Sequence, residues 1–303
     1  MAMMHARTAL PSHTTNGNIN NGNKSRRRRR RNIHLPVCRS TIHDDSGDTV
    51  RNHEAAQRMA ERLLEMDIGG NGRTITVVGL AGIPGSGKTT TSEMAVQLAN
   101  ASAGGGDAPF IVLPMDGFHL RKEQLRDSRM RRRRGAHFTF DAEALVTKIR
   151  ELKQMGAPQS DTESVGWPSF DHSIGDPRPD DIQVRAGVHR VAVIEGLYML
   201  LGSGPWVERD PDAEPTDAAL FKFWNALRDV DEGLLDARWW VSCSRDTAME
   251  RVVRRHMRAN GDTEESARTR VKGNDRRNAD LILSSIVNDI DANLVDCSFD
   301  NSS

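Results

Sequence analysis

Apolar side chains recur at helical spacing where the patterned part of the chain begins. One face of a helix wound through residues 53–66 would carry the apolar positions Ala56, Met59, Ala60, Leu63 and Met66. The glycine-rich run 67–72 follows, and it contains the residue types that end helices. The pattern predicts an amphipathic helix at the start of the folded region.

Beyond this helix, short runs rich in β-branched and aromatic residues alternate with longer amphipathic segments. Strands are expected at 74–80, 110–113, 191–194 and 239–242. Helices are expected at 88–100, 141–154 and 246–258. Such alternation is typical of an α/β fold, a mainly parallel sheet with helices on both faces.

The first 50 of the 303 residues lack this pattern. They contain few apolar residues, so they cannot bury enough surface to offset the entropy of ordering, and we expect a disordered tail. Residues 1–43 hold nine basic and no acidic residues, which leaves the remainder with 42 acidic and 33 basic residues and a net charge of −9. Three interpretations stay open: an organelle-import leader, a nuclear address or polyanion patch at Arg26 to Arg31, and a solvated extension.

Charge and composition exclude several functions. An acidic body is unlike a nucleic-acid binder, which needs a basic face. The sequence has no run of about 18 apolar residues, so no transmembrane helix is expected. The tail lacks an apolar signal core, which argues against secretion and for a cytoplasmic or organellar protein. Three widely spaced cysteines, Cys38, Cys243 and Cys297, fit neither a disulfide framework nor a zinc site.

The strongest motif follows the first expected strand. Residues Gly82 to Thr89 match Gly-x-x-x-x-Gly-Lys-Ser/Thr at every fixed position, between a strand and a helix. Glycines let the backbone turn its N–H groups toward phosphate oxygens, Lys88 adds charge at the outer phosphates, and the Thr89 hydroxyl suits Mg²⁺. We therefore expect MgATP to bind at Gly82, Pro84, Gly85, Ser86, Gly87, Lys88, Thr89 and Thr90.

Nucleotide binding alone does not define the chemistry. The chain has no Asn-Lys-x-Asp tetrapeptide for reading guanine, which disfavours a GTPase. Asp116 follows the second expected strand, and ligands bind at the carboxyl ends of parallel strands. A carboxylate there can take the proton of an attacking hydroxyl. On the residues alone, an ordinary Asp-Gly turn explains Asp116 equally well.

Further motifs resemble the phosphoribulokinase/uridine kinase family of P-loop kinases. They are the phosphate loop, residues 112–119, 134–141, 168–171 and 193–198, and the pair Asn274 and Asn278. Their order and spacing along the chain match the family as well as their content. The resemblance spans roughly residues 52–299 and is nearest to a poorly characterised bacterial and fungal branch, some of whose members are associated with fructose uptake. The family also includes the bacterial-type pantothenate kinases.

The resemblance implies roles for several residues. Asp116 would be the catalytic carboxylate, and Glu195 would lie near Mg²⁺ or its waters. A helical lid near residues 246–275 would bring arginines over the phosphates. Arg251, Arg254, Arg255 and Arg258 share one helical face, and Arg251 and Arg255 are the catalytic candidates. Alternatively, the arginines form a solvated helix face. Glu195 could likewise be a strand-end carboxylate that caps the following turn.

The same resemblance indicates where a small acceptor would bind. His119, Arg134, Phe140 and Asp171 are the candidate substrate-binding residues. Aromatic residues in this region could equally be core residues. Arg134 belongs to a basic run at 129–134 that is longer than the family's usual pair.

Together these features predict an ATP-dependent, Mg²⁺-requiring phosphotransferase with an alcohol acceptor: a nucleoside, vitamin or sugar. The alternative is a P-loop ATPase with a regulatory or chaperone role and no small acceptor. Neither the acceptor nor the oligomeric state follows from the sequence, and a homodimer stays open.

Overall fold

The computed structural model describes residues 48–69, 74–104, 108–155, 163–202, 221–291 and 297–301. The expected tail lies outside the described residues up to position 47. Residues 48–50, counted with the tail by composition, form the first turn of helix α1 (Asp48–Gly69).

A five-stranded parallel sheet organises the fold. Its spatial order is β2 (Phe110–Pro114), β5 (Val191–Gly196), β1 (Thr76–Ala81), β6 (Ala237–Ser242) and β7 (Cys297–Asp300). The four expected strands are all present. β1 and β5 are buried almost throughout, as strands covered on both faces must be. The α/β prediction is thereby confirmed, and β7 is an addition that the sequence pattern did not predict.

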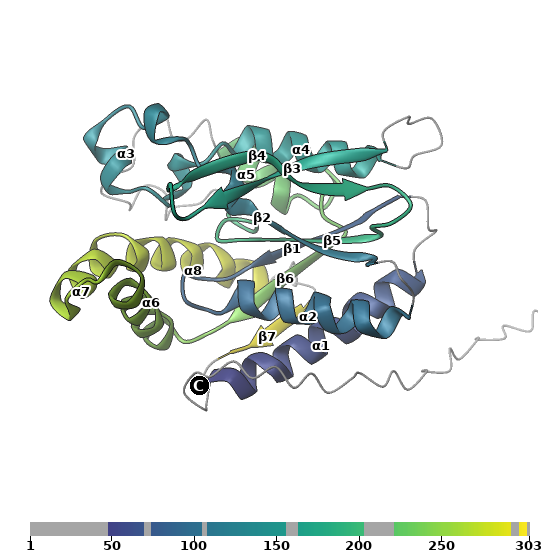
Figure 1. The fold of residues 1–303 in the computed structure, drawn as a ribbon, viewed down its shortest axis with the longest axis horizontal. Helices are drawn as coiled ribbons and strands as arrows, with labels where there is room; N and C mark the ends of the chain where they lie inside the picture. The colour runs from purple at the N-terminus through teal and green to yellow at the C-terminus, as the bar shows by residue number, and fades with distance from the viewer. Residues whose placement is uncertain are drawn as a thin grey trace, which may run out of the picture. The chain divides into compact units, whose positions relative to one another are not determined.

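Helices cover both faces of this sheet (Figure 1). On one side α1 packs along α2 (Lys88–Ala103). On the other side lie α4 (Ala142–Gln154) and α5 (Phe221–Arg228). Three consecutive helices, α6 (Arg245–Asn260), α7 (Glu264–Gly273) and α8 (Asp275–Asp291), form a group at one edge. The segment 246–275, expected to form a lid, comprises most of α6, all of α7 and the first residue of α8, and its action as a lid stays a prediction.

Short elements follow β2 and shape the carboxyl edge of the sheet. They are the 3₁₀ turns Met115–Phe118, Lys122–Gln124 and His137–Thr139 and the short helix α3 (Ser128–Arg132). An isolated bridge between His119 and Phe140 closes this segment on itself. The residues of the Asp116 motif are thus held in a compact loop.

An antiparallel hairpin, β3 (Ser164–Asp171) and β4 (Asp176–Arg185), lies beside this loop. Its register shifts between Trp167 and Ser169, where Pro168 has no N–H to donate. The Trp167 indole donates to the Pro114 carbonyl over 2.9 Å and packs edge-on against Phe118, with ring centroids 5.0 Å apart. The hairpin is therefore anchored to the end of β2.

None of the helices in the described part of the chain is long and apolar enough to cross a membrane.

The buried face of α1 gives a test of its place in the core. Met59 and Leu63 are fully buried, whereas Arg62 is exposed and pairs with Glu65. Leu63→Ala should lower the free energy of unfolding by about 2–5 kcal/mol, because it leaves a cavity in a packed core. Arg62→Ala should change it by less than about 0.5 kcal/mol. Chemical denaturation measures both, and equal effects would show that α1 does not pack as described.

Candidate active site

The phosphate-binding loop joins the central strand β1 to α2. Gly85 and Gly87 have φ values of +79° and +85°, which favour glycine. A Cβ on Gly85 would also lie 2.1 Å from the Ala248 carbonyl oxygen of α6. Pro84 and Ser86 are buried, Lys88 is half-buried, and Thr89 and Thr90 are exposed at the start of α2. The expected nucleotide-binding residues thus form one loop, closely packed from outside.

Strand register brings two acidic residues toward this loop. Glu195 is paired with Leu80 of β1 on one side and with Pro114 of β2 on the other. Asp116 comes two residues after Pro114, so both carboxylates lie at the carboxyl edge of the sheet. Burial raises the pKa of Glu195 to about 7, opposed by the Lys88 ammonium group and reinforced by the carboxylate of Asp116.

Glu195 and Thr89 together fit a magnesium site. The Thr89 hydroxyl hydrogen-bonds the Glu195 carboxyl group. Glu195 Oε2 is buried and has no hydrogen-bond partner among the described residues. Hydroxyl and carboxylate oxygens are hard ligands that Mg²⁺ accepts. No described group of three or more His, Cys, Asp or Glu side chains could hold a metal ion unaided, so phosphate and water oxygens would have to complete the coordination.

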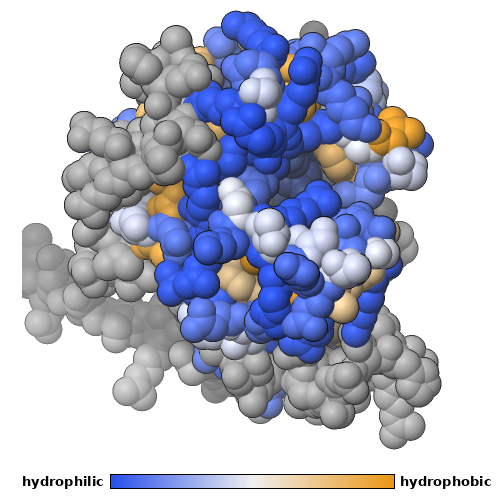
Figure 2. Space-filling view, turned by 90° about the vertical axis from the view of Figure 1, so that its left-hand side faces the viewer, coloured by the Kyte–Doolittle hydropathy of each residue, from blue (hydrophilic) through white to orange (hydrophobic). Residues whose placement is uncertain are grey.

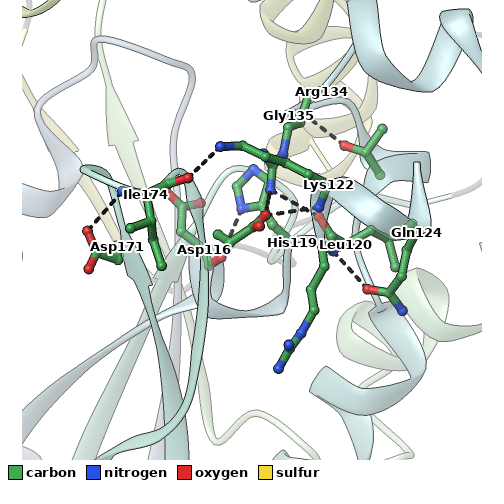
Figure 3. A network of polar contacts seen from close by, with 12 residues as sticks. Asp116, His119, Leu120, Lys122, Gln124, Arg134, Gly135, Asp171 and Ile174 are labelled. Carbon is green, nitrogen blue, oxygen red and sulfur yellow. Dashed lines mark hydrogen bonds and ion pairs between the residues drawn. The ribbon is translucent and has the colours of Figure 1, made fainter.

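His119 is held directly beside Asp116. Its Nδ1 lies 2.8 Å from the Asp116 carbonyl oxygen (Figure 3). Its ring packs against Phe140 and Phe170 at centroid distances of 4.0 and 4.8 Å. Burial lowers the pKa of His119, against the opposing charge of Asp116. The imidazole is therefore neutral at neutral pH and offers a polar edge within an aromatic cluster.

Arg134 approaches the same cluster from the following loop (Figure 3). Its Nη2 donates to Asp176 over 2.7 Å and to the Leu120 carbonyl over 3.1 Å. Its guanidinium carbon lies 5.6 Å from the ring centroid of Phe170. The structure thus brings together three of the four expected substrate-binding residues, His119, Arg134 and Phe140.

The fourth, Asp171, is engaged in the turn of the β3–β4 hairpin. Its carboxylate accepts from the Ser173 hydroxyl and N–H and from the Ile174 N–H, and it pairs with Arg178. The hydrogen bonds from Ser173, more than the nearby charge of Arg178, lower the pKa of Asp171 to about 2. These contacts hold the carboxylate in the turn, and a role in acceptor binding stays a prediction.

One of the two candidate lid arginines lies against the phosphate loop. Arg251 is half-buried, and its Nη1 lies 3.5 Å from the Gly85 carbonyl and 3.3 Å from Cys243 Sγ. Arg255 is exposed one turn further along α6. The face of the molecule that includes α3, α6 and α7 is predominantly hydrophilic and hollowed near its centre (Figure 2).

The structural role of Arg133 is not evident from the amino-acid sequence. This residue is 3% exposed, and its side chain donates to Asn274 and Asn278 over 3.0 Å each. The two asparagines in turn donate to the carbonyls of Arg134 and Gly135. The Asn274 and Asn278 motif therefore fixes the loop that carries Arg134 to the start of α8. Arg133 and the two asparagines are far apart in the sequence, so no local pattern indicates that they are in contact.

The fold and this site define a P-loop nucleotide-binding protein of the α/β class. No protein-family model matches the chain. The chain is 33% identical over 217 residues to a Schizosaccharomyces pombe protein provisionally named a uridine kinase, covering 70% of this chain and 79% of that one. It is 35% identical over 175 residues to the ATP-dependent kinase-like protein notR' of Aspergillus versicolor, covering 56% and 87%.

A solved structure agrees with these relatives. A provisionally named fructose transport system kinase from Silicibacter sp. TM1040 superposes with a TM-score of 0.59 at 27% identity, over 76% of this chain and 94% of that one. YFH7 of Saccharomyces cerevisiae, provisionally described as a P-loop kinase with a circular permutation, shares the fold at 19% identity and a TM-score of 0.59, over 83% of this chain and 99% of that one. The chain belongs to the phosphoribulokinase/uridine kinase family of P-loop kinases, as its motifs predicted.

The raised pKa of Glu195 predicts a pH dependence for the ligand-free protein. The folded state keeps the proton between about pH 4.5 and pH 7, while the unfolded chain loses it. Stability from this group is thus present below about pH 4.5 and lost as the pH rises through 7.

Glu195→Gln should remove this loss, raising the free energy of unfolding at pH 8 by an amount on the order of 3 kcal/mol or less. At pH 4.5 the variant should match the parent protein. Denaturation at both pH values measures the difference, and an equal effect at both would contradict a titrating Glu195.

Proposed function

We propose that the protein is an ATP-dependent small-molecule kinase that transfers the γ-phosphoryl group of MgATP to an alcohol group of a nucleoside, vitamin or sugar. One observation carries the proposal: the phosphate loop, Asp116 and the His119 cluster meet at one edge of the sheet. A hydrolytic ATPase needs the loop and a group that orients water, but it needs no binding site for a small acceptor. A kinase needs a carboxylate and an acceptor pocket next to the phosphates.

The phosphate loop would bind the triphosphate of ATP. Its glycines turn backbone N–H groups inward, and the N-terminus of α2 adds a partial positive charge. The half-buried Lys88 ammonium lies near Glu195, where it can neutralise negative charge on the outer phosphate. Thr89 and Glu195 would hold Mg²⁺, which when bound neutralises phosphate charge and orients the outer phosphates.

Asp116 would act as the base toward the acceptor. It takes the proton of the acceptor hydroxyl as that oxygen forms its bond to the γ-phosphorus. The bond between this phosphorus and the bridging oxygen breaks, and the electron pair leaves with ADP. His119 and Arg134 would orient the acceptor through their polar atoms, and Phe140, which is only 2% exposed, would support the His119 ring. Arg251 contacts the Gly85 carbonyl on the outer side of the loop, so it would have to leave this contact to reach the transferred group, whereas the exposed Arg255 would approach from the next turn of α6.

The identity of the acceptor can be tested by a screen. Purified protein with MgATP is offered uridine and other nucleosides, pantothenate, ribulose phosphate, fructose and other ketohexoses, and ADP release is scored. Uridine and fructose come first because similar proteins carry those names. Release that requires one added metabolite supports a kinase, whereas release stimulated only by a protein partner supports the ATPase alternative.

Asp116→Asn tests the assignment of the base. The amide keeps the size of the side chain but cannot accept the proton. Acceptor-dependent ADP release should fall by about 10²-fold or more, while ATP affinity is kept or slightly improved by the lost negative charge. The matched control is Asp231→Asn in the exposed turn after α5, which should leave both unchanged. Lost ATP affinity in proportion to turnover would instead make Asp116 a magnesium ligand.

A further inference from the structure

Asn301 is the last described residue of the chain, and it lies directly behind the phosphate loop. It follows β7, is fully buried, and was not singled out by any sequence pattern. The parallel pairing of β7 with β6 places Asp300 opposite Ser242. Asn301 therefore emerges at the carboxyl edge of the sheet, where the loop also lies.

The nitrogen of its side-chain amide bonds the loop and α2, whereas Oδ1 is buried with no hydrogen-bond partner among the described residues. Nδ2 donates to the Ser86 carbonyl and to the Thr91 hydroxyl, each over 3.0 Å. These contacts join residues 215 and 210 positions apart in the sequence. Asn301 thus supplies a buried hydrogen bond to a carbonyl oxygen at the centre of the Gly-x-x-x-x-Gly-Lys-Thr motif.

The backbone of Asn301 ties the same point to two further elements. Its N–H donates to the Ser242 carbonyl at the end of β6 over 2.7 Å. Its carbonyl accepts from Arg251 Nη2 of α6 over 3.3 Å. Arg251 in turn lies near the Gly85 carbonyl. The neighbouring carbonyls of Gly85 and Ser86 are therefore contacted on the outer side of the loop by Arg251 and Asn301. These two residues are joined to each other through the Asn301 carbonyl.

Peptide geometry gives these outer contacts a consequence inside the loop. In a trans peptide the C=O and N–H groups point in opposite directions. A Ser86 carbonyl held outward by Asn301 therefore directs the Gly87 N–H inward, to the side where phosphate binds. The space is tight: a Cβ on Gly87 would lie 3.1 Å from Asn301 Nδ2 and 3.1 Å from Asn52 Oδ1 of α1.

We propose that Asn301 is a positioning residue for nucleotide binding, which sets the orientation of the Ser86–Gly87 peptide by its hydrogen bond to the Ser86 carbonyl. The inference rests on the MgATP binding in the proposed function but not on the acceptor. Without this donor the peptide can rotate, and the loop must be ordered each time the nucleotide binds, which weakens affinity.

The test compares Asn301→Ala with a matched asparagine elsewhere. Asn100 also makes two side-chain hydrogen bonds to backbone, with the N–H and carbonyl of Phe110, near the far end of α2. Asn301→Ala should weaken MgATP binding, measured by calorimetry, by about tenfold, the scale expected for two lost hydrogen bonds. Asn100→Ala should lower the melting temperature by at least as much yet keep the parent affinity.

Two more measurements keep the inference falsifiable. Asn301→Asp keeps the side-chain shape but replaces the donor with an acceptor, so it should weaken MgATP affinity at least as strongly as Asn301→Ala. It serves as the test if the alanine variant does not fold. In ligand-free Asn301→Ala, hydrogen exchange of the amides in residues 84–92 should be several-fold faster than in the parent chain and in Asn100→Ala.

A folded Asn301 variant with parent affinity would overturn the inference, and so would an equal loss of affinity in Asn100→Ala. A parent chain that fails to bind MgATP would overturn it together with the proposed function. A parent chain that binds MgATP but phosphorylates none of the acceptors would count against the kinase alone, because affinity is measured without an acceptor.

Discussion

A loop can direct its N–H groups toward an anion only if its carbonyl groups are satisfied on the other side. This constraint explains much of what surrounds residues 82–89. The Ile83 carbonyl accepts from the Ser86 N–H within the loop, while the carbonyls of Gly85 and Ser86 face Arg251 and Asn301. Helix α6 must approach closely for this, and the missing side chain of Gly85 permits it. The packing of β6, β7 and α6 can therefore be understood as the outer support of one turn of backbone.

The opposite side of the loop holds charge that the protein alone does not balance. Glu195 is buried near Lys88, but Asp116 and Glu93 add negative charge, and one oxygen of Glu195 has no partner among the described residues. Such a group costs free energy unless a cation or proton compensates it. In the ligand-free state a proton bound to Glu195 removes this charge, and the pKa of Glu195 is raised for that reason. The site is thus electrostatically prepared for a divalent cation and less stable without one.

Patterns of neighbouring residues predicted most of the helices, the strands of the main sheet except β7, and the phosphate loop. The period of apolar residues predicted α1, α2, α4, α6 and four strands, and the spacing of glycines predicted the loop. The β3–β4 hairpin was missed because Pro168, Pro177 and Pro179 interrupt it and its outer positions are polar. The buried Arg133 looked like any arginine in a solvated basic run. Its asparagine partners lie about 140 positions later, and no local rule connects them.

The position of β7 also bears on how the protein matures. The loop is synthesised at residues 82–89, yet its contact with Asn301 spans 215 positions. Contacts of such long separation form late, because the intervening chain must first be ordered. A nascent polypeptide that has not yet reached β7 can thus pair β1 with β5 and cover them with α2, but it cannot complete the support of the loop. Tight nucleotide binding would then be acquired only after residue 301 has been synthesised, and nucleotide would favour chains that contain β7 over chains truncated before it.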